Sequence, residues 1–310
     1  MRGVPQLGLG LDAGGSQTRW ALVDANAKLL TEGHVEGMSG LQLHSDAGLS
    51  SLRATLRALA HTLDEFVRGQ PLALYGGFTG LGATHDKAAL LTVLQEALPI
   101  SASHTTLTHD MDIAYRAAFT PGAGYLVYAG TGSIAAFIDE RGQTHLAGGR
   151  GYLLGDEGGG YWIAREALAW TWRQENRAPG AWKQSPMAQR LFDAVGGSEW
   201  QFTRALVYGS NRGEIGRLAL QVAASSQDDP FAHALLLRAG AALGELAQHM
   251  LHRFGQRPVT AGGRALLLSP LLEEGVRAAL PPNIELQVIP DLAAHVTAAC
   301  LAVTIGQIDR

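Results

Sequence analysis

The feature that most constrains this chain is a pair of glycine-rich turns that lie far apart in the sequence. The first runs from Asp12 to Thr18 (DAGGSQT) and the second from Ala129 to Ser133 (AGTGS), each directly after an apolar run. Both patterns predict a strand, a tight turn and a second strand. Such turns point backbone N–H groups and small hydroxyls into a concavity that suits phosphate oxygens. The pair therefore predicts nucleotide-dependent phosphoryl transfer.

Composition limits the other classes of function. The chain has 310 residues, 46% of them hydrophobic and 17% charged, which is enough for two well-buried domains. A net charge of −4 gives no support for nucleic-acid binding. The single cysteine, Cys300, excludes a disulfide framework and is expected to be a buried structural thiol. No apolar stretch reaches the length of a membrane span and no signal peptide is visible, so we expect a cytoplasmic protein without a membrane partner.

The predicted elements occur twice in the same order, which indicates a duplicated α/β topology. The first series is strands at 6–11, 19–24 and 28–35, helix 46–67, strand 72–76, helix 86–97, a strand end at 105–108 and helix 110–119. The second is strands at 124–129, 133–139 and 144–147, a mainly helical region over 160–254, strand 257–260, a helix from 269–270, strand 284–289 and helix 292–305. The domain border is expected near residues 119–122.

Five stretches, in this order along the chain, resemble the sugar kinase–actin–heat-shock chaperone superfamily. They are most similar to its N-acetylglucosamine kinase branch, which also includes the activating ATPases of benzoyl-CoA-type reductases. The stretches are Asp12 to Thr18, Thr108 to Asp110, Ala129 to Ser133, Gly148 to Gly159 with its Gly-Asp-Glu-Gly signature, and Ala261 to Arg264. The resemblance implies two duplicated ribonuclease-H-like (actin-like ATPase) domains with an interdomain cleft. It assigns 1–119 plus 291–310 to the N-terminal lobe and 120–290 to a C-terminal lobe with a helical insertion.

The resemblance also implies ATP and Mg²⁺ as cofactors. The phosphates and adenosine would be held by Gly14, Gly15, Ser16, Thr18, Gly130, Thr131, Gly132, Gly262 and Gly263. Asp12 would hold Mg²⁺ partly through water, since that ion prefers oxygen ligands and keeps several waters. The alternative interpretations are an aspartate that opens a turn and two ordinary glycine hairpins. Gln17 stands where lysine is frequent, and Arg19 is the one basic residue beside either turn.

Asp110 is the expected catalytic base, because phosphoryl transfer to a hydroxyl needs a carboxylate that orients the nucleophile and accepts its proton. It also starts a predicted helix, so N-capping is its alternative role, and one aspartate can do both. Asp112 is the competing candidate. Asp112 lies two residues further along the predicted helix, so its side chain points to a different side of the helix from that of Asp110. This favours Asp110 as the base.

The acceptor pocket departs from the family pattern at three places, although the phosphate turns are intact. No asparagine lies near Met38 to Gly40, Ile134 replaces an asparagine that often follows the second turn, and Arg150 replaces a tryptophan. Arg150 either meets an anionic substituent of the sugar or is an exposed loop residue. Glu157 is expected to be structural. The resemblance implies sugar contacts by Asp110, Ser133, Gly149, Arg150, Gly151 and Asp156.

Together these observations predict an ATP-dependent kinase acting on a hydroxyl of an amino sugar, most similar to N-acetylglucosamine kinase. Its partner would be the small-molecule sugar, and we expect a homodimer. One alternative is a non-catalytic sugar- or nucleotide-sensing protein, which the presence of Asp12 and Asp110 disfavours. The other is an activating ATPase of the same fold, which would need cluster cysteines that one cysteine cannot supply.

Overall fold

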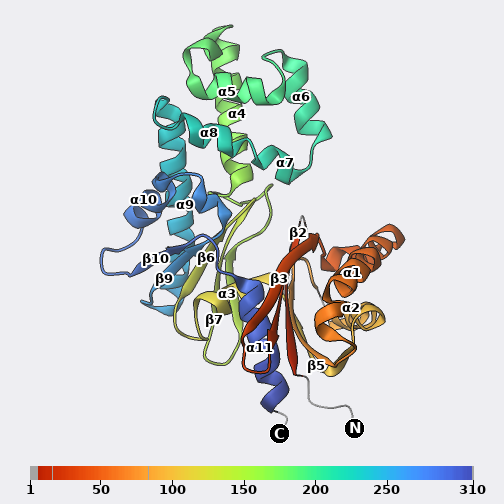
Figure 1. Ribbon diagram of the computed structural model, residues 1–310. Helices are drawn as coiled ribbons and strands as arrows, with labels where there is room; N and C mark the ends of the chain where they lie inside the picture. The colour runs from red at the N-terminus through yellow and green to blue at the C-terminus, as the bar shows by residue number, and fades with distance from the viewer. Residues whose placement is uncertain (1–5, 16, 83, 309–310) are drawn as a thin grey trace. The chain divides into compact units, whose positions relative to one another are not determined.

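The computed structural model describes residues 6–15, 17–82 and 84–308, with side chains described up to residue 304. The chain divides into two compact units. Unit 1 comprises Met1–Ala118 and Ala293–Arg310, and unit 2 comprises Phe119–Leu292. Each unit is built on one five-stranded sheet (Figure 1).

The sheet of unit 1 mixes antiparallel and parallel pairing. Its strands are β1 (Leu7–Ala13), β2 (Gln17–Asp24), β3 (Leu29–Glu36), β4 (Leu72–Phe78) and β5 (Ile100–Thr108), in the spatial order β3-β2-β1-β4-β5. Neighbours among β1, β2 and β3 are antiparallel, whereas β4 is parallel to β1 and β5. The carboxyl ends of β1, β4 and β5 therefore meet at one edge of the sheet.

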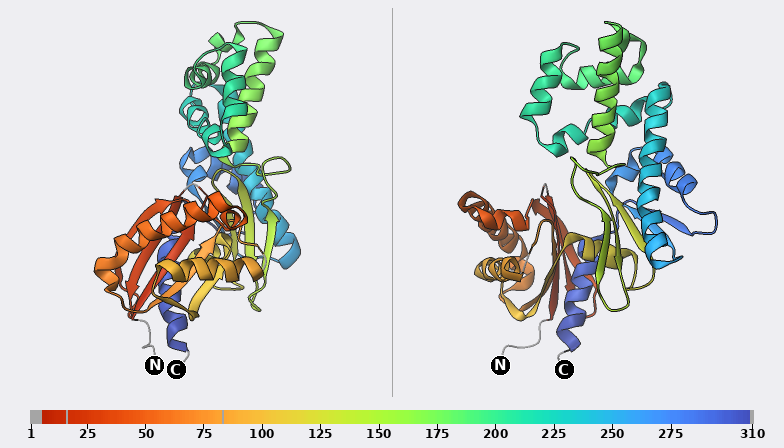
Figure 2. Two further views of the ribbon diagram at one scale, coloured as in Figure 1. Left: turned by 90° about the vertical axis from the view of Figure 1, so that its right-hand side faces the viewer. Right: turned by 180° about the vertical axis from the view of Figure 1, so that it is seen from behind.

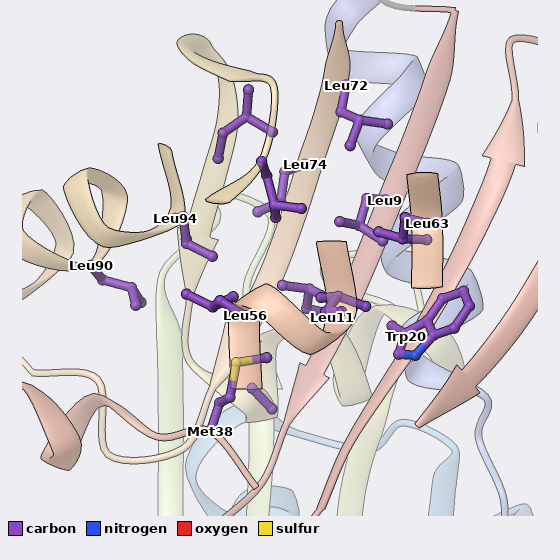
Figure 3. Close-up of a cluster of buried hydrophobic side chains, with 14 of the residues drawn as sticks. Leu9, Leu11, Trp20, Met38, Leu56, Leu63, Leu72, Leu74, Leu90 and Leu94 are labelled. Carbon is purple, nitrogen blue, oxygen red and sulfur yellow. The ribbon is translucent and has the colours of Figure 1, made fainter. Parts of the chain in front are cut away.

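One face of this sheet is covered by α1 (Asp46–Val67) and α2 (Thr84–Ala97), with the short 3₁₀ helix η1 (Gly40–His44) between β3 and α1. Leucines from the two helices and from β1 and β4 form the core there, together with Trp20 and the fully buried Met38 (Figure 3). The recurrence of leucine at three- and four-residue spacing turns one stripe of α1 towards the sheet. Ser45 caps α1 by accepting the N–H of Gly48.

The opposite face carries α3 (Asp110–Ala118) and α11 (Ala294–Ile308). The sequence of β1 explains how α11 comes so close, since Leu7, Leu9 and Leu11 point into the leucine core while Gly8 and Gly10 point the other way. A Cβ on Gly10 would lie 2.0 Å from the backbone oxygen of His295. Glycine is therefore required for the α11 backbone to lie directly on β1.

Unit 2 repeats the connectivity of unit 1. Its strands are β6 (Tyr125–Ala129), β7 (Ser133–Ile138), β8 (Thr144–Gly148), β9 (Val259–Gly262) and β10 (Leu286–Ile289), in the order β8-β7-β6-β9-β10. As in unit 1, the first three strands are antiparallel and the next two are parallel. The duplicated topology expected from the sequence is thus present.

A group of helices is inserted between β8 and β9 of unit 2. It contains α4 (Gly160–Arg177), η2 (Ala181–Gln184), α5 (Pro186–Val195), α6 (Trp200–Gly209), α7 (Arg212–Gly216), α8 (Ala219–Ser225) and α9 (Pro230–Phe254), as Figure 2 shows in two views. Helix α9 packs on β6 and β7, and α10 (Pro270–Ala279), which follows η3 (Arg264–Leu267), packs on α9. Asp229 caps α9 by accepting the N–H groups of Phe231 and Ala232.

The structure differs from the sequence expectations in details. Strand β5 begins at Ile100, whereas the sequence indicated only a strand end at 105–108. Cys300 is half-buried rather than buried, with its Sγ 3.9 Å from the carbonyl of Ala27, and burial raises the pKa of its thiol. Among the described residues, no helix combines the length and apolarity needed to cross a membrane.

Candidate functional site

In unit 1, Asp12 and Asp110 lie at the same edge and on the same face of the sheet. Asp12 is level with Gly77 on β4, and Gly77 is level with Thr108 at the end of β5. A Cβ on Gly77 would lie 3.0 Å from the Cα of Asp110, so α3 begins directly over this glycine. Because side chains alternate along β1, Asp12 shares the face of Gly10, where α3 and α11 pack. The fold thus brings together the two carboxylates singled out from the sequence.

The Asp110 carboxylate is held in a fixed orientation at the first residue of α3. Its Oδ1 accepts the N–H of Met111 at 2.8 Å and contacts Nδ1 of His109 at 2.5 Å. The hydrogen bond to Asp110 raises the pKa of the His109 imidazole above its ordinary value. Asp110 therefore combines a capping contact with a partly accessible carboxylate, as the two roles considered for it require.

Asp112 has a different environment, in which its carboxylate is already used. Its Oδ1 accepts hydrogen bonds from the Tyr75 hydroxyl at 2.7 Å and from Nε of Arg116 at 2.8 Å. Burial, followed by the charge of Asp112, raises the pKa of the Tyr75 hydroxyl. This network joins α3 to β4, which gives Asp112 a structural role.

The first glycine-rich turn is a tight hairpin between β1 and β2. The Gly14 N–H donates to the carbonyl of Gln17 at 3.1 Å, and Gly15 is exposed. Thr18 is fully buried, and its hydroxyl accepts the N–H of Met38 at 2.9 Å. That bond joins the end of the turn to the segment after β3. In this geometry the Thr18 hydroxyl stabilises the turn. Ser16 lies outside the described residues.

The second glycine-rich turn is fastened to the start of the helical insertion. The N–H of Gly130 donates to the carbonyl of Gly132, while the carbonyls of Gly130 and Thr131 accept the N–H groups of Gly160 and Tyr161 at 2.9 and 3.0 Å. Two of the N–H groups that a helix leaves without an internal partner are thereby satisfied by the turn. The Gly130–Gly132 turn and α4 consequently form one rigid piece of unit 2.

Asp156 lies directly on the second turn. It is only 4% exposed and has a left-handed backbone conformation with φ of 63°. A Cβ on Gly132 would lie 2.5 Å from Oδ2 of Asp156, so the carboxylate sits against the glycine backbone. A non-glycine residue in this conformation is uncommon, and such positions cluster at functional sites.

Arg212, at the start of α7, is a site residue that sequence reasoning missed. Its Nη1 donates to Oδ2 of Asp156 at 3.1 Å, and its guanidinium lies 5.9 Å from the ring centroid of Tyr152. Arg212 is thus a basic side chain near the second turn that is remote from it in the sequence, in addition to Arg19, which directly follows the first turn. Asn211 and Glu214 form a capping box that fixes where α7 starts, and this Asn-x-x-Glu pattern was the available sequence signal.

Hydrogen bonds attach the loop between β8 and α4 to the sheet, whereas Arg150 of the same loop is exposed. Ser133, which is buried, donates its hydroxyl to the carbonyl of Glu157 at 2.6 Å, and Gly149 donates its N–H to the carbonyl of Ser133. Gly149 and Gly151 both have positive φ. Arg150 is exposed and lines a cavity with the carboxyl-terminal part of α9, apart from the Asp156 carboxylate. Ser133 thus ties the loop to the sheet.

Gly262 and Gly263 adjoin the second turn because β6 and β9 are parallel neighbours. Gly262 pairs with Tyr128, and a Cβ on Gly263 would lie 2.3 Å from the backbone oxygen of Ala129. With φ of 100°, Gly263 has a conformation that favours glycine. Unit 2 therefore gathers Gly130 to Gly132, Asp156 and the Gly262–Gly263 pair at one edge of its sheet.

Comparison with known proteins agrees with this arrangement. A model of the BadF/BadG/BcrA/BcrD ATPase family matches residues 9–302. The chain belongs to this ATPase family. The match extends over both units and includes every residue singled out above as a candidate for the site.

The chain is also similar to two curated proteins and to a solved structure. N-acetylmuramic acid/N-acetylglucosamine kinase of Clostridium acetobutylicum is 28% identical over 166 residues, and N-acetyl-D-glucosamine kinase of Dictyostelium discoideum is 27% identical over 169 residues. The matched segments cover 52% of this chain and 51% and 52% of those relatives, about half their length. A Chromobacterium violaceum structure, named as a candidate N-acetylglucosamine kinase, has a TM-score of 0.71 and 23% identity, covering 98% of this chain and 100% of that one. It shares the two-domain fold.

The residues at the unit 1 edge fit a magnesium ion. Mg²⁺ is usually held by one or two carboxylates together with substrate phosphates and waters, rather than by a cage of protein ligands. Asp12 is a half-buried carboxylate beside the first turn that would suit such an ion. Within the described residues there is no cluster of three or more histidine, cysteine or acidic side chains that would form an all-protein metal site.

Proposed function

We propose that this protein is an ATP-dependent kinase that phosphorylates a hydroxyl of an amino sugar, either N-acetylglucosamine or a related hexosamine. The family supplies the nucleotide part of this proposal, since its members are ATPases. The sugar part is supported by the names of the two curated relatives. Both relatives are kinases of N-acetylated amino sugars.

The observation that carries the proposal is the placement of Asp110 on the face and edge of the sheet that also hold Asp12. In this role Asp110 accepts the proton of the sugar hydroxyl as the hydroxyl attacks the γ-phosphorus. The N–H of Met111 fixes the orientation of the carboxylate, so it need not be ordered again when the sugar binds. Asp112, tied to Tyr75 and Arg116, is not available for this task.

Asp12 would hold Mg²⁺, which when bound neutralises phosphate charge and supports the in-line transfer. Backbone N–H groups of the two turns would bind phosphate oxygens, apart from those of Gly14 and Gly130, which donate to Gln17 and Gly132 within the turns. The Gly262–Gly263 pair would contact the adenosine. A side chain at Gly263 would collide with the backbone of Ala129, so glycine keeps this segment against the second turn.

Asp156 would accept hydrogen bonds from sugar hydroxyls, with Arg212 and Gly132 holding its carboxylate in place. Two of the departures from the family pattern lie in different settings. Met38 is fully buried and Ile134 packs against Gly149. Met38 therefore lies in the core of unit 1, away from a bound sugar. Ile134 stands where an asparagine is frequent, so this position would offer the sugar no side-chain hydrogen bond.

A coupled assay of ADP release tests the proposal directly. The panel is glucosamine, N-acetylglucosamine, N-acetylmannosamine, N-acetylmuramic acid and glucose, each with ATP and Mg²⁺. We expect sugar-dependent ADP release with at least one amino sugar, and the phosphorylated sugar in the products. ATP hydrolysis that no sugar accelerates would contradict the proposal and would favour an ATPase without sugar transfer.

A further inference from the structure

Unit 2 contains a cavity that the proposed sugar phosphorylation does not use. It has a volume of about 500 Å³ and lies between β8, the loop that follows it and the carboxyl-terminal part of α9. This volume is within the range of sites that hold small molecules. We propose that this cavity binds a small organic anion, a phosphomonoester or carboxylate attached to an apolar body.

The charge of the lining favours an anion. Arg150 comes from the loop, and His249, His252 and Arg253 come from α9, whereas Glu157 is the one acidic side chain among the lining residues. His249 and His252 are three residues apart, so they project from the same side of the helix. The two arginines alone outweigh the single carboxylate, and protonation of either histidine increases the excess.

Most of these polar side chains have no partner inside the protein. Among the residues that the structure describes, the side chains of Arg150, His249, His252 and Glu157 make no hydrogen bond or ion pair with another residue. Arg253 is oriented by its Nη1, which donates to the carbonyl of Leu146 at 2.9 Å. The cavity is therefore lined by basic side chains that form no ion pair among the described residues.

The apolar part of the lining defines the rest of the ligand. Leu146, Leu154 and Leu246 contribute to the walls, and Leu154 is 78% exposed. An inorganic ion would leave the exposed Leu146 and Leu154 in water, whereas an organic body would cover them. Apolar walls with a few convergent polar groups are the usual composition of a small-molecule site.

The cavity shares one residue with the expected sugar contacts, since Arg150 lines it, but it excludes the carboxylate that we assign to sugar binding. Neither Asp156 nor Gly132 lines it, and the Asp156 carboxylate is directed to Gly132 and Arg212. The adjacent residue, Glu157, lines the cavity. A ligand there would touch the back of the loop that carries Asp156, so it need not compete with a sugar.

Calorimetric titration of the full-length protein with phenyl phosphate and, separately, with sodium benzoate tests the site and distinguishes the two anions. Phenol serves as the uncharged probe. The decisive variant is His249→Gln/His252→Gln, both exposed positions of α9, and the matched control is His233→Gln, an exposed histidine of the same helix away from the cavity. Histidine side-chain NMR of the wild type locates the bound probe.

We expect saturable binding of at least one anion, about tenfold weaker in the double variant, which corresponds to about 1.4 kcal/mol, and unchanged in His233→Gln. Phenol should bind more weakly than either anion. In the NMR spectra, the signals of His249 and His252 should move on titration. Equal affinity of the double variant and the wild type would overturn the proposal, as would unmoved signals or the absence of saturable binding by both anions. None of these readouts depends on kinase activity, so failure here is distinguishable from failure of the proposed function.

Discussion

The guanidinium of Arg212 donates to the Asp156 carboxylate across 3.1 Å, although the two residues belong to different segments of unit 2. Asp156 is 4% exposed, so the hydrogen bond from Arg212 replaces water that burial removes from its carboxylate. The arginine side chain is 45% exposed, which leaves part of its surface open to solvent. The pair therefore positions a carboxylate that we assign to sugar binding.

Replacing Arg212 should weaken sugar binding more than nucleotide binding. We expect Arg212→Gln to raise the KM for the sugar by about 10- to 100-fold, because loss of a charge-assisted bond to a buried carboxylate costs about 1.5–3 kcal/mol. Steady-state kinetics with each substrate varied in turn provides the measurement. Arg217→Gln, five residues further along at an exposed position, is the matched control. An unchanged sugar KM in Arg212→Gln would remove the pair from the site.

Gly132→Ala should disturb Asp156 directly. The added methyl group would lie 2.5 to 2.9 Å from the three carboxyl-group atoms of Asp156, and the burial of that side chain leaves it little room to move. We expect a loss of about 1–3 kcal/mol in the free energy of unfolding, typical of overpacking, and a strong loss of turnover. Gly209→Ala, where nothing lies within 4 Å of the new methyl group, is the control. Urea unfolding of both variants measures the loss of stability. Equal free energies of unfolding for Gly132→Ala and Gly209→Ala would contradict the predicted clash with Asp156.

The contact between His109 and Asp110 should make stability depend on pH. Because the folded state raises the pKa of His109, its contribution is fully present below the unfolded value of about 6.5 and is lost as the pH rises through the raised folded value. His109 is 47% exposed, so we expect a contribution below about 1 kcal/mol. His109→Asn should therefore destabilise the protein at acidic pH more than at alkaline pH in urea titrations. The exposed His61→Asn should show no such difference, and an equal loss for His109→Asn at both pH values would contradict this account.

Metal removal should abolish turnover. The first turn has no lysine, and Gln17 stands where one is frequent. The negative charge of a triphosphate therefore needs a metal cation there. We expect no sugar-dependent ADP release in EDTA and full recovery when excess Mg²⁺ is added. Asp12→Asn should raise the Mg²⁺ concentration needed for half-maximal activity. Full activity in chelated buffer would show that the metal is not required.

Much of the fold could be predicted because local signals agreed with it. The leucine periodicity gave α1 the bounds that the structure has, and the helical region expected over 160–254 begins with α4 and ends with α9. The site was less accessible to sequence reasoning. Thr18 and Ser133 are small hydroxyl residues in the expected turns, yet their hydroxyls bond to Met38 and Glu157 of distant segments. Such tertiary hydrogen bonds leave no local pattern.

Arg212 shows the same limit more clearly. It lies 56 residues after Asp156, in the helical insertion, where no spacing rule connects it to the Gly-Asp-Glu-Gly loop. Only the packing of α7 beside the start of α4 brings the two together, and that contact is made by Gly216 next to Tyr161. A motif search finds the carboxylate, but the arginine that holds it requires the fold.

The most direct test of the whole account compares Asp110→Asn with Asp112→Asn in turnover of the sugar found by the ADP-release screen. We predict that Asp110→Asn keeps its nucleotide binding and loses less than about 1 kcal/mol of stability, but loses about 10²–10⁴-fold in kcat, the usual contribution of a general base. Asp112→Asn should keep most of its turnover while losing about 1–3 kcal/mol of stability, because Tyr75 and Arg116 lose their acceptor. Near wild-type kcat in a folded Asp110→Asn protein would contradict the account.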